Sequence, residues 1–261
     1  MRADKFFAER FGSRTKAAEA LEKGWVLING KPVRPKDEVK EGAEIVFVES
    51  GDRFVSNGGY KLARAFERFD CTASGVFVDI GASTGGFTDC LLQNGASRVY
   101  AVDVGESQLH DTIASDERVI IMDSTNARYL EKSDFPEAID GVVTDVSFIS
   151  LRLIFPAISN ILSENGYAIT LIKPQFECEN KNIGKSGIVH TSAHAEIVKR
   201  VLGYAKESGL YPYAITNAPI RKGKNVEYVA LWKKTAGGMK EYEVLLAVKD
   251  LLNKHSLNEL Q

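Results

Sequence analysis

Residues 75–105, GVFVDIGASTGGFTDCLLQNGASRVYAVDVG, decide the fold of this chain. Residues 75–80 are an apolar run typical of a buried strand, residues 87–94 are expected to form a helix, and residues 97–102 indicate a second strand. Strands that alternate with helices build a parallel sheet with helices on its faces. The stretch therefore predicts a Rossmann-like α/β domain.

The same alternation continues towards the end of the chain. We expect helices at residues 61–69, 108–114, 151–163 and 193–208, and strands at residues 119–122, 141–146 and 167–173. Two late strands, at residues 211–217 and 227–233, are expected to be antiparallel. The pattern predicts a doubly wound, mostly parallel sheet. The spacing of apolar residues over 241–255 indicates a last helix, which either packs back on the body or binds a partner.

The first fifty residues have a different pattern of expected helices and strands and a different charge. Helices are expected at residues 3–10 and from Ser13 to Lys23, and strands at residues 25–28 and 44–48. Residues 2–36 hold nine lysines or arginines against four acids, whereas the net charge of all 261 residues is only −2. This local excess suits contact with phosphates, although solvated surface charge is its commoner cause.

These changes of pattern predict the organisation of the chain. We expect a small α+β domain at residues 1–49, a linker at 50–57, an α/β domain at 58–234 and a C-terminal helical extension at 235–261.

Cysteine usage and hydropathy exclude several classes of protein. The three cysteines, Cys71, Cys90 and Cys178, form no CxxC pair, so we expect neither a disulfide framework nor a zinc site, and no metal. No apolar run approaches the roughly 20 residues of a membrane helix, and the start does not have the pattern of a signal peptide. We expect a cytoplasmic protein without stable membrane insertion. The sequence does not fix the oligomeric state.

The turn after the first strand has the glycine spacing G-x-x-x-G-G. This differs from the G-x-G-x-x-G of dinucleotide enzymes and from the lysine-bearing P-loop. Asp103 ends the second strand, where an acid can accept hydrogen bonds from both hydroxyls of an adenosine ribose. An acid at that position, without a basic cradle for a pyrophosphate, favours S-adenosylmethionine (product S-adenosylhomocysteine) over NAD.

Each part of that cofactor has an expected position. Asp79 and Gly81 are expected on its methionine side and Asp103 at the ribose. Either Asp123 or Asn126 is expected to face the adenine, and both could instead cap a turn. The expected cofactor residues are Asp79, Gly81, Ala82, Ser83, Thr84, Gly85, Gly86, Phe87, Asp103, Asp123, Asn126 and Asp145.

Charged residues stand at four strand or helix ends. In LIKPQFE, residues 171–177, Lys173 ends an apolar run, and the following proline keeps it extended. Asp145 ends another predicted strand, Glu227 begins one, and Lys61 opens the helix after GGY. One such charge is usually a surface ion pair. Four charged residues of alternating sign at the ligand-binding edge of a sheet indicate a functional site.

Two resemblances follow from these motifs. Residues 13–47, SRTKAAEALEKGWVLINGKPVRPKDEVKEGAEIVF, resemble the S4 RNA-binding domain. The residues that carry this match are Ser13, Arg14, Gly24, Val26, Asn29, Gly30, Val33, Pro35, Val39, Gly42 and Ile45. The motifs GGYKL, DIGASTGGFTD, AVDVG, TDVSFISL, IKPQFE and GKNVEYVALW resemble the TlyA family, in which an S4 module precedes an FtsJ-like RNA ribose methyltransferase domain.

The resemblance implies a function and a set of residues. It implies 2′-O-methylation of ribose in ribosomal RNA, on cytidines of one or both ribosomal subunits. The implied tetrad is Lys61, Asp145, Lys173 and Glu227, and the implied RNA-binding residues are Arg2, Lys5, Arg14, Lys16 and Lys31.

The chemistry of methyl transfer suggests a role for each tetrad residue. A ribose hydroxyl is a poor nucleophile and must lose its proton during attack. Lys173 is expected to contact it, as general base or as stabiliser of the developing oxyanion. Asp145 would hold that lysine, and Lys61 and Glu227 would orient the ribose.

Three other functions compete with this one. Members of the family are often labelled haemolysins, but we find neither membrane-spanning helices nor alternating amphipathic strands in the sequence. A non-catalytic RNA- or ribosome-binding protein is opposed by the complete tetrad and the intact glycine turn. An NAD-dependent oxidoreductase is opposed by the glycine spacing.

Overall fold

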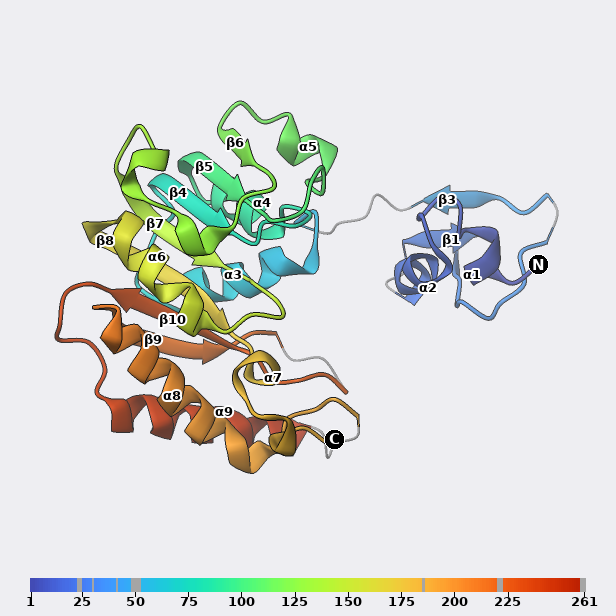
Figure 1. Cartoon of the computed structure of the whole chain (residues 1–261). Coiled ribbons are helices and arrows are strands. Elements are labelled where there is room, and N and C mark those ends of the chain that lie inside the picture. The colour runs from blue at the N-terminus through green and yellow to red at the C-terminus, as the bar shows by residue number, and fades with distance from the viewer. Residues whose placement is uncertain are drawn as a thin grey trace. The chain divides into compact units, whose positions relative to one another are not determined.

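The computed structural model describes residues 1–22, 25–29, 31–40, 42–47, 53–184, 186–219 and 223–258. The chain divides into two compact units, residues 1–53 and 54–261, and each is described by itself (Figure 1). Several positions named above lie outside the described residues: Lys23, Gly24, Gly30, Val48, residues 50–52 of the expected linker and residues 259–261 of the expected extension.

The first unit combines two short helices with a three-stranded antiparallel sheet of order β2-β1-β3. Its elements are α1 (Ala3–Phe6), α2 (Arg14–Glu22), β1 (Val26–Ile28), β2 (Lys31–Pro32) and β3 (Ile45–Phe47). Asn29 adopts a left-handed φ of 51° directly after β1, as tight hairpin turns require. Phe7, Leu21 and Val26 are buried in the core. Helix α1 is shorter than the expected 3–10, because residues 7–12 form turns.

The second unit is built on a seven-stranded sheet of order β6-β5-β4-β7-β8-β10-β9. Its strands are β4 (Gly75–Ile80), β5 (Ala96–Val102), β6 (Val119–Met122), β7 (Ile139–Thr144), β8 (Leu162–Ile172), β9 (Tyr211–Asn217) and β10 (Tyr228–Lys233). Strands β6, β5, β4, β7 and β8 pair in parallel. Strand β10 is antiparallel to both β8 and β9. The predicted doubly wound, mostly parallel sheet is therefore confirmed.

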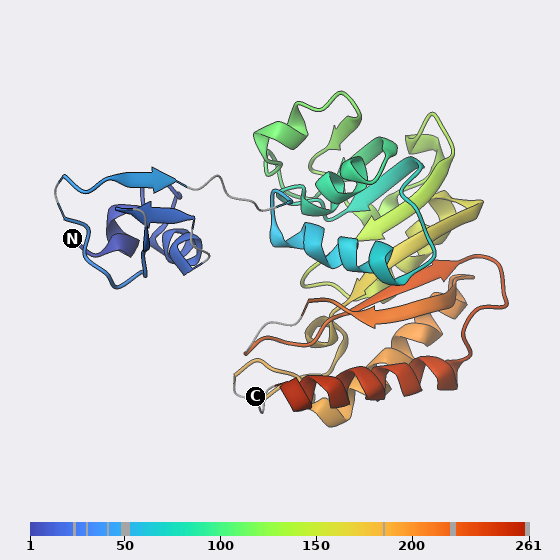
Figure 2. The same cartoon turned by 180° about the vertical axis from the view of Figure 1, so that it is seen from behind.

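Helices cover both faces of this sheet, and each face buries its own apolar cluster. Helices α3 (Asn57–Arg68) and α4 (Gly86–Gln93) pack on one face, with Leu62 and Leu91 buried (Figure 2). Helices α6 (Phe155–Ile161) and α8 (His194–Glu207) pack on the other, with Phe155 and Val201 buried (Figure 1). Helix α9 (Glu241–Asn258) lies against α8 and β9 and buries Val244, so it packs back on the body.

Short helical segments join these elements. They are α5 (Asp111–Ala114), α7 (Pro174–Glu177) and the 3₁₀ turns η1 (Ala127–Tyr129), η2 (Lys132–Asp134), η3 (Leu151–Leu153), η4 (Asn180–Asn182) and η5 (Thr191–Ala193). Helix α5 starts at Asp111 and not at the expected residue 108, because the side chain of His110 caps it by accepting from the Thr112 amide.

Two other helices differ from the expected ranges for steric reasons. Helix α3 begins four residues before the expected Lys61. A Cβ on Gly59 would lie 2.3 Å from the Phe54 ring, so glycine in this helix allows close packing where the sequence suggested a loop. The helix expected at residues 151–163 is divided into η3 and α6. Pro156 fits only in the first turn of a helix, so the helix begins anew beside it.

Candidate active site

The carboxyl ends of four parallel strands meet at one edge of the sheet in the second unit. The residues that follow these ends are Gly81 after β4, Asp103 after β5, Asp145 after β7 and Lys173 after β8. Asp145 and Lys173 each lie just beyond the strand that was expected to contain them. Strand β10 pairs antiparallel with β8, with Tyr228 opposite Ile172, so Glu227 reaches the same edge.

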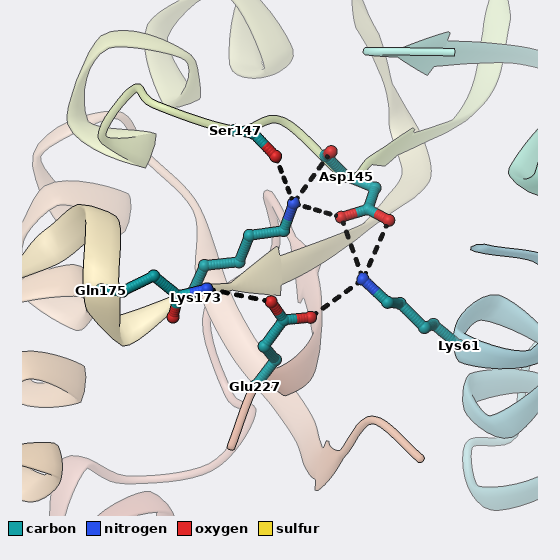
Figure 3. A network of polar contacts seen from close by, with 6 residues as sticks. All are labelled: Lys61, Asp145, Ser147, Lys173, Gln175 and Glu227. Carbon is teal, nitrogen blue, oxygen red and sulfur yellow. Dashed lines mark hydrogen bonds and ion pairs between the residues drawn. The ribbon is translucent and has the colours of Figure 1, made fainter. Parts of the chain in front are cut away.

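Lys61, Asp145, Lys173 and Glu227 form one connected polar network (Figure 3). The Nζ of Lys61 donates to Asp145 Oδ2 at 3.2 Å and to Glu227 Oε2 at 2.9 Å. The Nζ of Lys173 lies 2.7 Å from Asp145 Oδ1. Asp145 therefore binds both ammonium groups. Four residues from separate segments, selected by their positions at strand and helix ends, meet at one point.

Lys173 is held by three acceptors. Its Nζ contacts Asp145 Oδ1, donates to the backbone oxygen of Asp145 at 3.2 Å and donates to Ser147 Oγ at 2.8 Å. An ammonium group has three N–H donors. Two of them are used in the hydrogen bonds to the Asp145 backbone oxygen and to Ser147 Oγ, and the nitrogen also forms an ion pair with Asp145 Oδ1.

The network is largely removed from water and balanced in charge. The exposed fraction of the side chains is 8% for Lys173, 18% for Asp145 and Glu227, and 22% for Lys61. Burial alone would lower the pKa of Lys61, but the carboxylates of Asp145 and Glu227 outweigh it and raise that pKa. Lys61 thus stays a cation at neutral pH, between two anions.

Three residues at the site were not selected from the sequence. Ser147 accepts from Lys173, and Gln175 Nε2 donates to Glu227 Oε1 at 3.1 Å (Figure 3). Phe148 has a left-handed φ of 62°, which is rare for a bulky residue, and the residue is 91% exposed. The motif TDVSFISL places Phe148 close to Asp145 in the sequence, which could have indicated that Phe148 lies at the site. The motif does not show its backbone angle.

Two adjoining cavities lie beside the network. A cavity of about 200 Å³ is lined by Ser56, Gly58, Gly81, Ala82, Ser83, Thr84, Gly86, Phe87, Asp145, Ser147 and Lys173. A larger one, of about 750 Å³, shares Gly81, Ser83, Asp145 and Ser147 with it and extends to Asp103, Asn126 and Phe148. Most of the expected cofactor residues therefore line one of two adjoining cavities that border the tetrad at Asp145.

The walls of these cavities do not include every expected cofactor residue. Asp79 is fully buried and accepts from Thr88 Oγ1 at 2.7 Å. Gly85, with a φ of 89°, precedes helix α4 as its N-cap. The carboxylate of Asp123 accepts from the Ser107 amide at 2.8 Å. None of these three residues lines either cavity, and of the two adenine candidates only Asn126 lines the larger one.

Asp103 and Asn126 already have backbone partners. Asp103 accepts from the amides of Ser83 and Gly105, each at 2.8 Å and each on a different oxygen. Asn126 Oδ1 accepts from the Arg128 amide at 3.2 Å. A carboxylate oxygen has two lone pairs, so each oxygen of Asp103 can accept a second hydrogen bond.

A third cavity lies on the other side of Lys61. It has a volume of about 210 Å³ and is lined by Lys61, Gln175, Ala218, Pro219, Lys224, Asn225, Val226 and Glu227. The tetrad thus has a hollow on each side, because Lys61 and Glu227 face this cavity while Asp145 and Lys173 face the glycine-lined one.

The expected RNA-binding residues all lie in the first unit. Lys5, Lys16 and Lys31 are exposed. Arg2 and Arg14 instead form ion pairs with one acid, Asp4.

Among the residues that the structure describes, no helix is long and apolar enough to cross a membrane. The same residues also contain no group of three or more His, Cys, Asp or Glu side chains arranged to hold a metal ion.

Comparison with known proteins gives two matching family models. Residues 54–235 match the FtsJ-like methyltransferase family, and residues 1–45 match the S4 domain. A Mycobacterium tuberculosis protein named 16S/23S rRNA (cytidine-2′-O)-methyltransferase TlyA is 39% identical, over 85% of this chain and 85% of its own length. Hemolysin A of Brachyspira hyodysenteriae is also 39% identical, over 84% of this chain and 92% of its own. A solved structure from Streptococcus thermophilus is 36% identical with a TM-score of 0.79, covering 100% of this chain and 98% of its own.

Proposed function

The chain belongs to the TlyA family of FtsJ-like methyltransferases, and we propose that it transfers the methyl group of S-adenosylmethionine to a ribose 2′-hydroxyl of ribosomal RNA. The observation that carries the proposal is the meeting of Lys61, Asp145, Lys173 and Glu227 beside the glycine-lined cavities.

The residues around these cavities fit S-adenosylmethionine. Gly81 lines both cavities, and a Cβ on it would lie 3.2 Å from the Val146 side chain, so glycine lets the turn pass close to Val146 at the cavity wall. The loop 81–87 would hold the methionine side, Asp103 the ribose hydroxyls and Asn126 the adenine. When bound, the cofactor supplies a methyl group on a positively charged sulfur.

Lys173 would act on the attacking hydroxyl. Ser147 Oγ is the neutral side-chain acceptor of its ammonium, so a ribose 2′-oxygen can replace Ser147 without loss of an ion pair. An ammonium at this place would stabilise the negative charge that develops on the oxygen while the methyl passes from sulfur to oxygen and the hydroxyl proton is released to water. The ion pair of Lys173 with Asp145 and its hydrogen bonds to two further oxygens support the role of stabiliser over that of general base.

The other three residues would position the reactants. Asp145 holds both lysines and borders the glycine-lined cavity, so it sets the distance between Lys173 and the donor side. Lys61 and Glu227 line the third cavity, and their ion pair, joined to Asp145 through Lys61, would orient the ribose beside Lys173. An in-line transfer gains much of its rate from such positioning.

The substrate follows from both units of the chain. The S4 domain would bind the RNA backbone through Arg2, Lys5, Arg14, Lys16 and Lys31. Exposed Phe148, at the larger cavity that borders the tetrad, offers a ring on which an unstacked base could stack. We propose cytidine as the modified nucleotide, supported by the name of the M. tuberculosis relative.

The test is methylation of purified ribosomal subunits. The protein is incubated with 30S or 50S subunits and labelled S-adenosylmethionine, and the modified nucleotide is mapped. Label on a ribose 2′-oxygen is the expected result. Label on a base, or no label on either subunit, would refute the proposal. Leakage of liposomes by the same preparation, without methylation, would favour the haemolysin name that one relative carries.

A further inference from the structure

Two arginines of the first unit share one buried carboxylate. Arg2 donates from Nε to Asp4 Oδ1 at 3.2 Å and from Nη2 to Asp4 Oδ2 at 2.8 Å. Arg14 approaches the same Oδ2 with Nε and Nη2, both at 3.0 Å. These three residues are called the arginine cluster below. Arg2 and Arg14 are twelve residues apart in the sequence, so only the fold brings them together.

The acid is buried while the arginines reach the solvent. The exposed fraction of the side chain is 7% for Asp4, 46% for Arg2 and 57% for Arg14. The hydrogen bonds from Arg2, joined by those from Arg14, lower the pKa of Asp4, so it is ionised at neutral pH. The backbone fixes the acid as well, since its amide donates to the Pro35 oxygen at 3.1 Å.

The cluster keeps an excess of positive charge and of donors. Two guanidinium groups and one carboxylate leave one net positive charge. Each guanidinium has five N–H donors in a rigid plane, and each uses its Nε and Nη2 edge on Asp4, so the Nη1 donors remain. Arg14 is also the first residue of α2, where the helix dipole favours anions.

We propose that Asp4 is a positioning residue of the RNA interface, which fixes Arg2 and Arg14 so that their outward donors bind one backbone phosphate together. The proposal rests on RNA being the partner. Without Asp4, two long side chains would have to be ordered and their mutual repulsion overcome when the phosphate binds. With it, both guanidinium planes are already in place.

The substitution Asp4→Asn distinguishes a positioning role from an effect of net charge, because the two predict opposite changes in RNA affinity. Removal of an acid from an RNA-binding face should strengthen binding if net charge decides it. Loss of the shared carboxylate should weaken binding, by roughly tenfold, if position decides it. Glu9→Gln is the matched control: Glu9 is exposed, forms no ion pair among the described residues, and its removal changes the charge of the same unit equally.

The measurement uses the full chain and transcribed 23S and 16S rRNA in filter binding over a range of KCl concentrations. We expect Asp4→Asn to reduce the slope of log K against log salt by about one, the value of one phosphate contact. In methylation assays it should raise KM for RNA and leave kcat at saturating RNA unchanged. Binding equal to or tighter than that of the wild type, in a folded variant, overturns the proposal.

A second set of variants covers the case in which Asp4→Asn does not fold, as judged by circular dichroism. Arg2→Lys and Arg14→Lys keep the charge but lack the planar fork, so each should weaken binding and reduce the slope. If both bind RNA as the wild type does, the proposal is wrong. A wild type that binds RNA with this pattern but methylates none would refute the proposed function and leave the positioning role standing.

Discussion

The tetrad of the second unit and the arginine cluster of the first are both built on an aspartate that binds two cations. In the tetrad a second acid balances the charge and all four side chains are mostly buried. In the arginine cluster only the aspartate is buried, and one positive charge is left over at the surface. The buried, charge-balanced tetrad can therefore affect only a substrate group that contacts it directly. The exposed positive charge of the arginine cluster can attract a polyanion, and salt screens that attraction.

The largest effect is expected from removal of the tetrad cation nearest the donor side. Lys173→Met should lower kcat by about a thousandfold or more, because the developing oxyanion loses its stabiliser. Binding of RNA should be unchanged, in contrast to variants of the arginine cluster. Single-turnover methylation and filter binding measure the two effects, and Lys206→Met, an exposed lysine of α8, is the control.

Lys173→Arg separates the two roles proposed for this lysine. Arginine keeps the charge and the donors but cannot act as a base at neutral pH. Activity clearly above that of Lys173→Met supports the stabiliser. Equal inactivity of the two variants, with intact folding, would favour the base.

Asp79 differs from Asp145 and Asp4, because no cation binds its carboxylate among the described residues. Asp79 is fully buried, receives one hydrogen bond from Thr88 and leaves Oδ1 without a partner among the described residues. Burial, only partly offset by Thr88, raises its pKa from 3.8 to about 7. Asp4 shows the opposite shift, because its hydrogen bonds from Arg2 and Arg14 lower its pKa.

Asp79→Asn should therefore stabilise the protein, and only at higher pH. Between pH 4 and 7 the folded protein keeps a proton that the unfolded chain has released. The contribution of Asp79 to the stability of the wild type is thus fully present below about pH 4 and is lost as the pH rises through 7. The variant should gain on the order of 2 kcal/mol at pH 8 and almost nothing at pH 4. Urea unfolding at the two pH values measures this, with the exposed Glu117→Gln as control; an equal gain at both would contradict it.

Phe148 tests whether RNA affinity belongs to the first unit alone. Phe148→Ala should raise KM for RNA by about tenfold, the value of one lost base stack, with little change in kcat. Because Phe148 is 91% exposed, a loss of stability above about 0.5 kcal/mol is unexpected. Leu246→Ala removes another exposed apolar side chain, 57% exposed and on α9, and should change neither constant. An unchanged KM would confine RNA recognition to other residues.

The positions at the sheet edge could be predicted because they depend on topology. Once a parallel sheet is inferred, the residues after its strands must share one edge, and this selected Asp103, Asp145 and Lys173. Glu227 needed the further expectation that the last strands are antiparallel. The predicted helix boundaries were wrong where tertiary packing determines them. Gly58 and Gly59 were expected in a loop, but they lie inside α3.

Contacts that depend on side-chain geometry were beyond the sequence. Nothing in MRADKF shows that Asp4 will receive Arg14 from another helix, so both arginines were expected simply to face RNA. Asp79 was expected at the cofactor because it precedes the glycine turn, yet the structure turns it into the core. Motifs identify the residue types that a site needs, and the fold decides which of them reach it.

The smallest effect should come from Ser147, the neutral acceptor of Lys173. If a ribose oxygen replaces Ser147 Oγ during catalysis, the hydroxyl matters only before substrate binds. Ser147→Ala should then lower kcat/KM by no more than a few fold, since the lost hydrogen bond is absent from the reacting complex. If Ser147 instead stays bound to Lys173 throughout, its loss frees a donor in the transition state and kcat should fall by tenfold or more. The size of this one change shows whether the lysine exchanges its partner, which the rigidly paired arginines of the first unit are not expected to do.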